Sequence, residues 1–296
     1  MSICIIFNPA ASGEKAKRFQ ESLEALDDTF ALKPTHCAGA ARQLAADAVR
    51  EGHKTIIAAG GDGTLNEVLN GIGDVPEGFA RVRFGVLPLG TINVFAREIR
   101  VPRKLEEVWS VFEKGHETTL DVGCAQLGSE KRLFLQLAGA GLDARSVELV
   151  SWNLKKKVGP LAYIIAGLQA LGGPQSRITV SNGQEEMTWE LVLIGNGKLY
   201  GGSYPVFHKS DLQDGILDAV VLDRVHWSTL PGLGLDFVLG RFFKDGRSGY
   251  LRGKELLLQA EGRTAFQVDG EAAGELPVRV TVLPRKLRVI TPGPNA

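Results

Sequence analysis

The sequence predicts two domains: an α/β domain with a parallel sheet over residues 1–122, and a mostly antiparallel β domain with helical insertions over residues 123–296. Three observations predict this organisation. Strand-like and helix-like segments alternate up to Leu120, glycine-containing turns follow two of the strands, and short strands separated by turns dominate after Val122. A chain of 296 residues is long enough to bury two cores.

The first domain is expected to alternate between strands and amphipathic helices. The strands are expected at Ile3–Phe7, Phe30–Thr35, Thr55–Ala59 and Arg83–Leu87, with Pro34 typical of a sheet edge. Helices are expected near residues 16–26, 40–50, 65–72 and 104–114, where apolar residues recur at helical spacing. This order predicts an open, Rossmann-like sheet with ligand-binding turns at the carboxyl ends of its strands.

The second domain is expected to consist of strands joined mainly by hairpins. The runs are Arg132–Ala138, Arg177–Ser181, Trp189–Ile194, Leu217–Leu222, Leu256–Gln259, Ala265–Val268 and Val278–Leu283. Asn182-Gly183 is a strong hairpin signal, and residues 143–172 and 226–243 are expected to be helical insertions. The carboxyl-terminal tail is the one part expected to pack back on the first domain.

Composition narrows the class of partner. The basic residues (Lys and Arg) and the acidic residues (Asp and Glu) each total 34. The chain therefore has no net positive charge that would favour binding to nucleic acid. Three widely spaced cysteines suggest reduced thiols and a cytoplasmic location. The amino terminus is expected to be a strand and not a signal peptide, and the longest apolar run, residues 158–173, is short for a membrane span.

The turn Gly60-Gly61-Asp62-Gly63-Thr64 lies between a buried strand and an amphipathic helix. Glycines allow the backbone to approach a ligand closely, and the amides at the helix start attract anions. The turn therefore predicts a phosphate-binding cradle, with Asp62 placed to meet a bound cation. A glycine-rich turn of this kind, taken alone, is more often a simple connection between two elements.

Further motifs along the chain, taken together with that turn, indicate a function for it. They are Asn8-Pro9, Gly60-Gly61-Asp62-Gly63-Thr64 with Asn66-Glu67, Gly90-Thr91, Asp121-Val-Gly, Ala138-Gly-Ala-Gly-Leu-Asp143, Ile194-Gly-Asn-Gly197, Tyr200-Gly-Gly202, Asp211-Leu-Gln-Asp214-Gly215 and Val268-Asp-Gly-Glu271. Together they resemble the catalytic domain of the diacylglycerol kinases, in particular the soluble lipid kinases of bacteria. The resemblance extends from about Ile5 to Ile290, whereas the glycine motif alone is also found in NAD kinases.

The resemblance implies ATP-dependent phosphorylation of a lipid hydroxyl, with the nucleotide held between the two domains. The residues implied to contact ATP are Asn8, Thr35, Gly60, Gly61, Asp62, Gly63, Thr64, Leu65, Asn66 and Thr91. Phosphoryl transfer uses a divalent cation, and Asp62 and Asp121, both expected at turns, are the candidates to orient hydrated Mg²⁺. The family commonly has an aspartate where this chain has Val94, so one acidic group is missing here.

Three further acidic residues take their proposed roles from the resemblance. Asp211, Asp214 and the carbonyl of Ile216 would form a structural Mg²⁺ site; without the family, Asp214-Gly215 is an ordinary turn. Glu271 matches the family's proton acceptor, and a carboxylate beside the acceptor hydroxyl can take its proton. Its alternative is an exposed acid at a hairpin tip.

We therefore expect a cytoplasmic lipid kinase that uses ATP and Mg²⁺ and acts on a diacylglycerol-like lipid or a phospholipid head group. An apolar segment at 158–168, preceded by Trp152 and three lysines at 155–157, and another at 227–243 suit peripheral contact with a membrane, although core packing is the commoner role of such segments. An NAD kinase-like enzyme, a lipid- or nucleotide-binding regulator with weakened turnover, and a homodimer remain open. The residues do not specify which lipid is phosphorylated.

Overall fold

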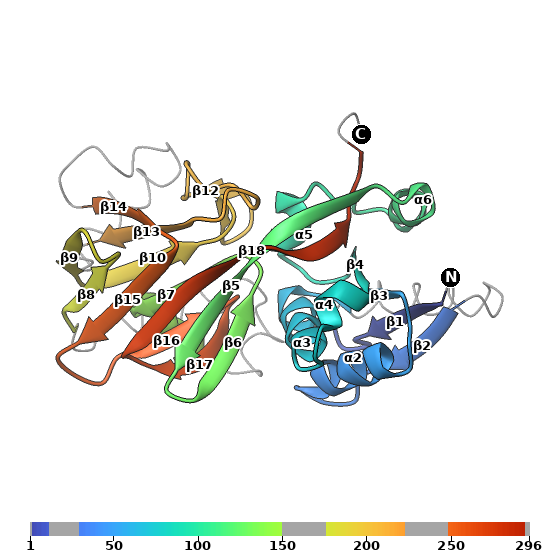
Figure 1. Cartoon of the computed structure of the whole chain (residues 1–296), viewed down its shortest axis with the longest axis horizontal. Helices are drawn as coiled ribbons and strands as arrows, with labels where there is room; N and C mark the ends of the chain where they lie inside the picture. Colours follow the sequence, from blue (N-terminus) through green and yellow to red (C-terminus); the bar gives the residue numbers. More distant parts are fainter. Residues whose placement is uncertain (1, 12–29, 150–175, 223–247, 294–296) are drawn as a thin grey trace. The chain divides into compact units, whose positions relative to one another are not determined.

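The computed structural model describes residues 2–11, 30–149, 176–222 and 248–293 (Figure 1). The chain divides into two compact units. The first comprises Met1–Asp121 together with Pro284–Ala296, and the second comprises Val122–Leu283. The carboxyl-terminal segment therefore belongs with the first unit.

The first unit contains a parallel sheet with strand order β2-β1-β3-β4-β18. Its strands are β2 (Phe30–Pro34), β1 (Ile3–Phe7), β3 (Thr55–Gly60), β4 (Arg83–Pro88) and the last residues of β18 (Val278–Ile290) (Figure 1). Helices α2 (Ala40–Arg50) and α3 (Asp62–Gly73) pack on each other and against this sheet. The unit also contains α4 (Gly78–Arg81), α5 (Val94–Glu98) and α6 (Leu105–Lys114).

The predicted elements of this unit agree with the structure wherever it describes them. The central strand β3 is buried along its whole length, as expected for a parallel strand covered on both faces. Strand β2, which contains Pro34, lies at the sheet edge. The helix predicted near residues 16–26 lies outside the described residues.

The second unit contains two antiparallel arrays. One has the order β14-β13-β10-β7-β16-β17, and the other runs β18-β15-β8-β9 with β5 and β6 attached through β18. The strands are β5 (Glu117–Leu127, which starts in the first unit), β6 (Glu130–Phe134), β7 (Leu137–Gly141), β8 (Ile178–Ser181), β9 (Glu186–Trp189), β10 (Leu191–Gly195), β13 (Leu217–Leu222), β14 (Ser248–Gly253), β15 (Glu255–Ala260), β16 (Ala265–Val268) and β17 (Glu271–Glu275). A small hairpin, β11 (Leu199–Tyr200) with β12 (Tyr204–Pro205), and helix α7 (Leu142–Leu149) complete the description.

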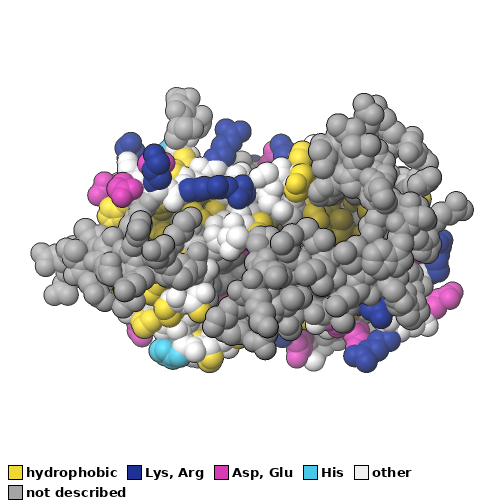
Figure 2. Space-filling view, turned by 180° about the vertical axis from the view of Figure 1, so that it is seen from behind, with side chains coloured by type: hydrophobic (Ala, Val, Ile, Leu, Met, Phe, Trp, Pro, Cys, Tyr) yellow, Lys and Arg dark blue, Asp and Glu magenta, His cyan; other side chains and the backbone are white. Residues whose placement is uncertain are grey.

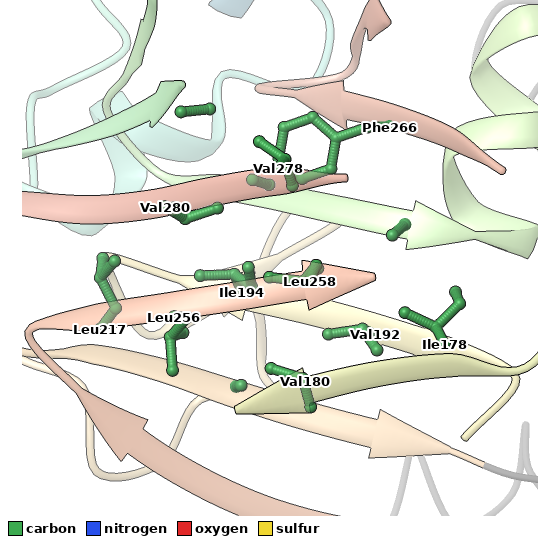
Figure 3. Close-up of a cluster of buried hydrophobic side chains, with 14 of the residues drawn as sticks. Ile178, Val180, Val192, Ile194, Leu217, Leu256, Leu258, Phe266, Val278 and Val280 are labelled. Atoms are coloured by element: carbon green, nitrogen blue, oxygen red, sulfur yellow. The ribbon is translucent and has the colours of Figure 1, made fainter. Parts of the chain in front are cut away.

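The core of the second unit is formed by apolar side chains from both arrays (Figure 3). Ile194 and Val192 come from β10, whereas Leu256, Leu258 and Val280 come from β15 and β18. The solvent-facing positions of β15 alternate with these buried ones, the pattern of a sheet with one covered face. The predicted antiparallel β domain is therefore confirmed.

Two predicted strands are each divided in the structure. The run Arg132–Ala138 separates into β6 and β7, which belong to different arrays, because the chain changes sheet at Leu135 and Gln136. The run Trp189–Ile194 likewise separates into β9 and β10. The hairpin at Asn182-Gly183 is confirmed: it joins β8 to β9, with Gly183 at φ 86°.

The predicted helical insertions are described only in part. Helix α7 covers the start of the first insertion, and its remainder and the whole of the second lie outside the described residues, together with both candidate membrane-contact segments. Among the helices that are described, none combines the length and apolar character needed to cross a membrane. Figure 2 shows basic and acidic side chains next to each other on one face, in line with the equal totals of the two charges.

Candidate functional site

Four predicted ligand contacts lie at the carboxyl ends of neighbouring strands. Thr35 follows β2, Asn8 follows β1, Gly60 ends β3, and Thr91 lies in the turn after β4. Backbone bonds join these ends: Thr35 N donates to Phe7 O at 2.8 Å, and Asn8 N donates to Ala59 O at 3.0 Å. The structure thus brings the predicted residues to one edge of the parallel sheet, where α/β proteins bind ligands.

The turns after β3 and β4 are in direct backbone contact. The amides of Leu89 and Gly90 both donate to Gly60 O, at 2.9 and 3.2 Å. A Cβ placed on Gly90 would lie 2.5 Å from the Cα of Gly61, closer than any side chain can be accommodated against backbone. Glycine at position 90 is therefore required by the close approach of the two turns.

Helix α3 starts directly at this contact. Gly61 is its N-cap and supplies no side-chain cap, and the first helical residues are Asp62, Gly63 and Thr64. The first amides of a helix have no acceptor within the helix and carry the positive end of its dipole. Asn8 Nδ2 donates to Thr64 Oγ1 at 3.2 Å, so the turn after β1 is fastened to the same helix start. The arrangement is suited to a phosphate group.

Asp62 links this helix to the turn after β4. Its carboxylate accepts hydrogen bonds from Val94 N at 3.1 Å and from Phe95 N at 3.3 Å, and so caps the start of α5. Val94, which stands where the family commonly has an aspartate, is the first residue of α5 and only 8% exposed. An aspartate there would place a buried carboxylate on the residue whose amide already donates to Asp62, so the valine suits this packing.

Three residues of the central motif have structural roles. Leu65 is 2% exposed, and its amide donates to Gly61 O at 3.1 Å, a hydrogen bond of the first turn of α3. Asn66 is buried and accepts hydrogen bonds from Asn70 Nδ2. Glu67 accepts the amides of Gly39 and Ala41 at 2.8 and 3.0 Å and so caps α2. The contact of Leu65 with ATP stays a prediction, and its side chain and amide serve the packing and the first turn of α3.

Asn93 is a site residue that the sequence alone did not single out. It has φ 52°, and its Nδ2 donates to Gly90 O at 2.6 Å, which closes the turn after β4. Its Oδ1 is buried and has no hydrogen-bond partner among the described residues. The signal that could have identified it is an asparagine, the residue type most tolerant of positive φ after glycine, two residues after Gly-Thr.

Asp121 does not occupy the turn that was predicted for it. It lies within β5, is 1% exposed, and accepts the amide of Arg285 at 2.6 Å. Arg285 interrupts β18 with φ 46°, a conformation that non-glycine residues rarely adopt. Asp121 therefore stabilises an irregular point in the strand, and its role toward Mg²⁺ stays a prediction.

Glu271 follows a tightly held two-residue turn. Val268 pairs with Glu271, and the residues between them, Asp269 and Gly270, have φ 47° and 81°, as in a type I′ turn. The Asp269 carboxylate accepts the amides of residues 135, 136 and 137 at 2.8, 2.9 and 3.1 Å. Glu271 itself is exposed at the start of β17. The turn fixes the backbone position from which its side chain extends.

The predicted structural metal site already contains a cationic side chain. Asp214 accepts Ile216 N at 2.9 Å through Oδ1 and Arg252 at 2.6 Å through Oδ2. The same guanidinium donates to Asp218 Oδ1 at 2.8 Å, and Asp218 is fully buried. Burial alone would lower the pKa of Arg252, but the carboxylates of Asp218 and Asp214 raise it.

These contacts would compete with Mg²⁺ at Asp211, Asp214 and Ile216, where the metal site stays a prediction. Asp211 is engaged by Gln213 N at 3.0 Å, and a divalent ion on Asp214 would repel the guanidinium already bound there. The part of the chain that the structure describes contains no group of three or more His, Cys, Asp or Glu side chains that could hold a metal. Arg252 supplies positive charge to the carboxylates of Asp214 and Asp218.

We expect Arg252→Gln to lower the free energy of unfolding by about 2 kcal/mol, because buried Asp218 loses its charged partner. Urea unfolding measures this loss. Arg279→Gln is the matched control, since its ion pair with Glu255 is exposed and such pairs contribute at most about 1 kcal/mol. A chelator should leave the wild-type melting temperature unchanged; a fall that Mg²⁺ reverses would contradict the assignment.

Comparison with known proteins gives matches over both units. Residues 2–125 match the family model described as diacylglycerol kinase catalytic domain, and residues 136–291 match the YegS C-terminal NAD kinase beta sandwich-like domain. A relative from Staphylococcus saprophyticus named diacylglycerol kinase is 31% identical, with 97% of this chain and 94% of the relative covered. One of the same name from Staphylococcus aureus strain MRSA252 is 32% identical, with 97% and 91% covered.

A solved structure shows the same fold. It is described as a diacylglycerol kinase from Bacillus anthracis strain Sterne, with a TM-score of 0.74 and 20% identity. The similarity covers 99% of this chain and 97% of that one. The similarity in structure therefore spans both units.

Proposed function

This chain belongs to the diacylglycerol kinase family, and we propose that it transfers the γ-phosphate of ATP to a hydroxyl of a diacylglycerol-like lipid or of a phospholipid head group. The family is one of lipid kinases, enzymes that phosphorylate an alcohol group. The observation that carries the proposal is the edge of the parallel sheet, where the turns after β1, β3 and β4 converge on the first turn of α3.

The nucleotide phosphates are proposed to bind at that first turn. Backbone amides of the Gly61–Thr64 segment would receive the phosphate oxygens, and Gly90 leaves space where a side chain would collide with Gly61. Asn8, Thr35 and Thr91 are proposed to contact the same ligand from the neighbouring strand ends. When bound, Mg²⁺ would neutralise charge on the phosphates. Asp62, whose two oxygens face the turn after β4, is the residue proposed to orient its water shell.

Glu271 is proposed to act on the acceptor. Its carboxylate would take the proton of the lipid hydroxyl as the hydroxyl oxygen forms its bond to the γ-phosphorus. The bond between that phosphorus and the bridging oxygen of ATP breaks, and ADP leaves with the electron pair. Atoms and charge balance with a protonated Glu271, which returns its proton to solvent.

Two other functions remain testable alternatives. An NAD kinase-like activity would use the same glycine motif, and the model that matches the second unit is itself described as NAD kinase-like. A regulator without turnover would bind the ligand at the same sheet edge. The full-length relatives named diacylglycerol kinase favour the lipid.

One assay separates the three functions. The protein is incubated with γ-labelled ATP and Mg²⁺, and with vesicles that contain diacylglycerol, vesicles of phosphatidylglycerol, or NAD in solution. We expect label in the lipid fraction of one of the vesicle samples. Label in NADP would identify the first alternative, and ATP binding without label in any acceptor would identify the second. Either result would overturn the proposal.

A further inference from the structure

The turn that precedes Glu271 is held by a second set of contacts, behind those of Asp269. Gln267 is 1% exposed, and its Oε1 accepts the amide of Gly270, the residue directly before Glu271, at 2.8 Å. Its Nε2 donates to Asp143 Oδ2 at 2.6 Å. A carboxylate only accepts hydrogen bonds, so Asp143 forces Nε2 toward itself and Oε1 toward Gly270.

Asp143 is itself fixed from another part of the unit. It lies in the first turn of α7, and its Oδ1 accepts the hydroxyl of Tyr200 from β11. Gly139 on β7 makes room for the pair, because a Cβ there would collide with Asp143 Oδ2 and lie 3.0 Å from Gln267 Nε2. Burial raises the pKa values of both the Asp143 carboxyl and the Tyr200 hydroxyl.

These contacts form a chain of defined donors and acceptors from Tyr200 through Asp143 and Gln267 to Gly270. No step of the proposed phosphoryl transfer uses Asp143, although keeping a carboxylate in this surrounding is costly. A role in fixing the shape of the turn at Asp269 and Gly270 accounts for the buried carboxylate of Asp143. The amide plane of Gly270 determines the backbone from which the Glu271 side chain extends.

We infer that Asp143, acting through Gln267, is a positioning residue that holds the Gly270–Glu271 backbone in the geometry needed for proton transfer from the acceptor hydroxyl. The inference rests on the proposed function, because a fixed backbone at Glu271 affects turnover only if Glu271 is the proton acceptor. It predicts that activity depends on the polarity of two buried side chains, neither of which contacts the reacting groups.

The inference is tested by swapping the carboxylate of Asp143 and the amide of Gln267 between the two positions, first one at a time and then together. In Asp143→Asn, the oxygen still accepts from Gln267 Nε2 when the new NH₂ group donates to the Tyr200 hydroxyl, but in the opposite orientation the NH₂ group faces a donor on Gln267, so Gln267 is no longer held toward Gly270 in every state. In Gln267→Glu, two carboxylates face each other. In the double variant the pattern is complementary again. Tyr200 donates to the oxygen of the introduced asparagine, whose NH₂ group donates to the introduced glutamate, and that glutamate accepts the amide of Gly270.

We expect each single variant to lose on the order of 10-fold or more in kcat for lipid phosphorylation, because displacement of a reacting group by about 1 Å costs up to roughly 10²-fold. The KM for ATP should stay near that of the wild type. The double variant should recover kcat to within about 3-fold of the wild type, since the hydrogen-bonding pattern is restored. A purely structural role would lower the melting temperature without separating kcat from KM.

A second measurement does not depend on activity. Hydrogen exchange in peptides covering residues 265–275 should be faster in both single variants and protected again in the double variant. Asn182→Ala is the control, because Asn182 stabilises the β8–β9 hairpin through the amides of Gln184 and Glu185. It should change neither the exchange of residues 265–275 nor kcat.

The outcomes separate this inference from the proposed function. The positioning role would be overturned if the single variants kept the wild-type kcat and the wild-type hydrogen exchange of residues 265–275. It would also be overturned if a folded double variant recovered neither quantity. In both cases the proposed function would stand as long as Glu271→Gln is inactive. If Glu271→Gln itself kept full turnover on lipid, the proposed function would fail first, and with it the role of the contacts behind it.

Discussion

Glu271→Gln should lower kcat for lipid phosphorylation by about 10² to 10⁴-fold, a barrier increase of roughly 3 to 5 kcal/mol. Glutamine keeps the size of the side chain but cannot take the proton of the acceptor. The backbone turn before it should persist, because Asp269 and Gln267 hold that turn through residues 135–137 and Gly270. The affinity for ATP and the melting temperature should therefore stay near wild-type values.

Initial rates at saturating ATP and lipid, together with an ATP titration, check this result. Glu275→Gln is the matched control: it lies on the same strand, and its ion pair with Arg263 is exposed. The control should change kcat by less than about two-fold, as expected for a surface substitution. Equal loss in the two variants, or a loss of ATP affinity in Glu271→Gln, would contradict the role of proton acceptor.

Asp62→Asn is expected to reduce turnover by about 10² to 10³-fold, comparable to removal of one preorganised electrostatic group from a reaction site. The neutral amide orients hydrated Mg²⁺ less well than a carboxylate does. It also places an NH₂ group where Val94 N or Phe95 N now donates, so the protein should lose roughly 1 to 3 kcal/mol of stability as well. This structural cost follows from the cap on α5.

Turnover across a Mg²⁺ titration and urea unfolding measure the two effects separately. Asp74→Asn is the control, because it makes the same change at the other end of α3, where Asp74 pairs with Arg42 at an exposed position. That control should keep turnover and lose at most about 1 kcal/mol. Wild-type turnover of Asp62→Asn at saturating Mg²⁺ would exclude Asp62 from the proposed metal-orienting role.

The strands of the first unit could be predicted from sequence because each is a short apolar run bounded by turn residues. The glycine turn was recognisable for the same reason: its chemistry is contained in five consecutive residues. The convergence of the strand ends then follows from parallel pairing, so the location of the candidate site was predictable once the fold class was known.

The roles of individual acids were less predictable, because their partners are distant in sequence. Asp62 caps a helix that starts 32 residues later, and Asp121 accepts an amide 164 residues later. Asp214 pairs with Arg252 across 38 residues, an ion pair that the spacing of the acids does not predict. The change of sheet between β6 and β7 coincides with amides bound by Asp269, more than 130 residues away. No local pattern records such contacts.

The cap that Glu67 supplies to α2 has a consequence for how substitution data on this family are interpreted. Glu67 stands one residue after Asn66, inside the same motif as the glycine turn, yet both of its oxygens are used by the amides of Gly39 and Ala41. A mutational scan scored by activity alone would group Glu67 with the nucleotide contacts. A parallel score for protein abundance in cells would separate them, because loss of the cap acts on the amount of folded protein and not on turnover per molecule.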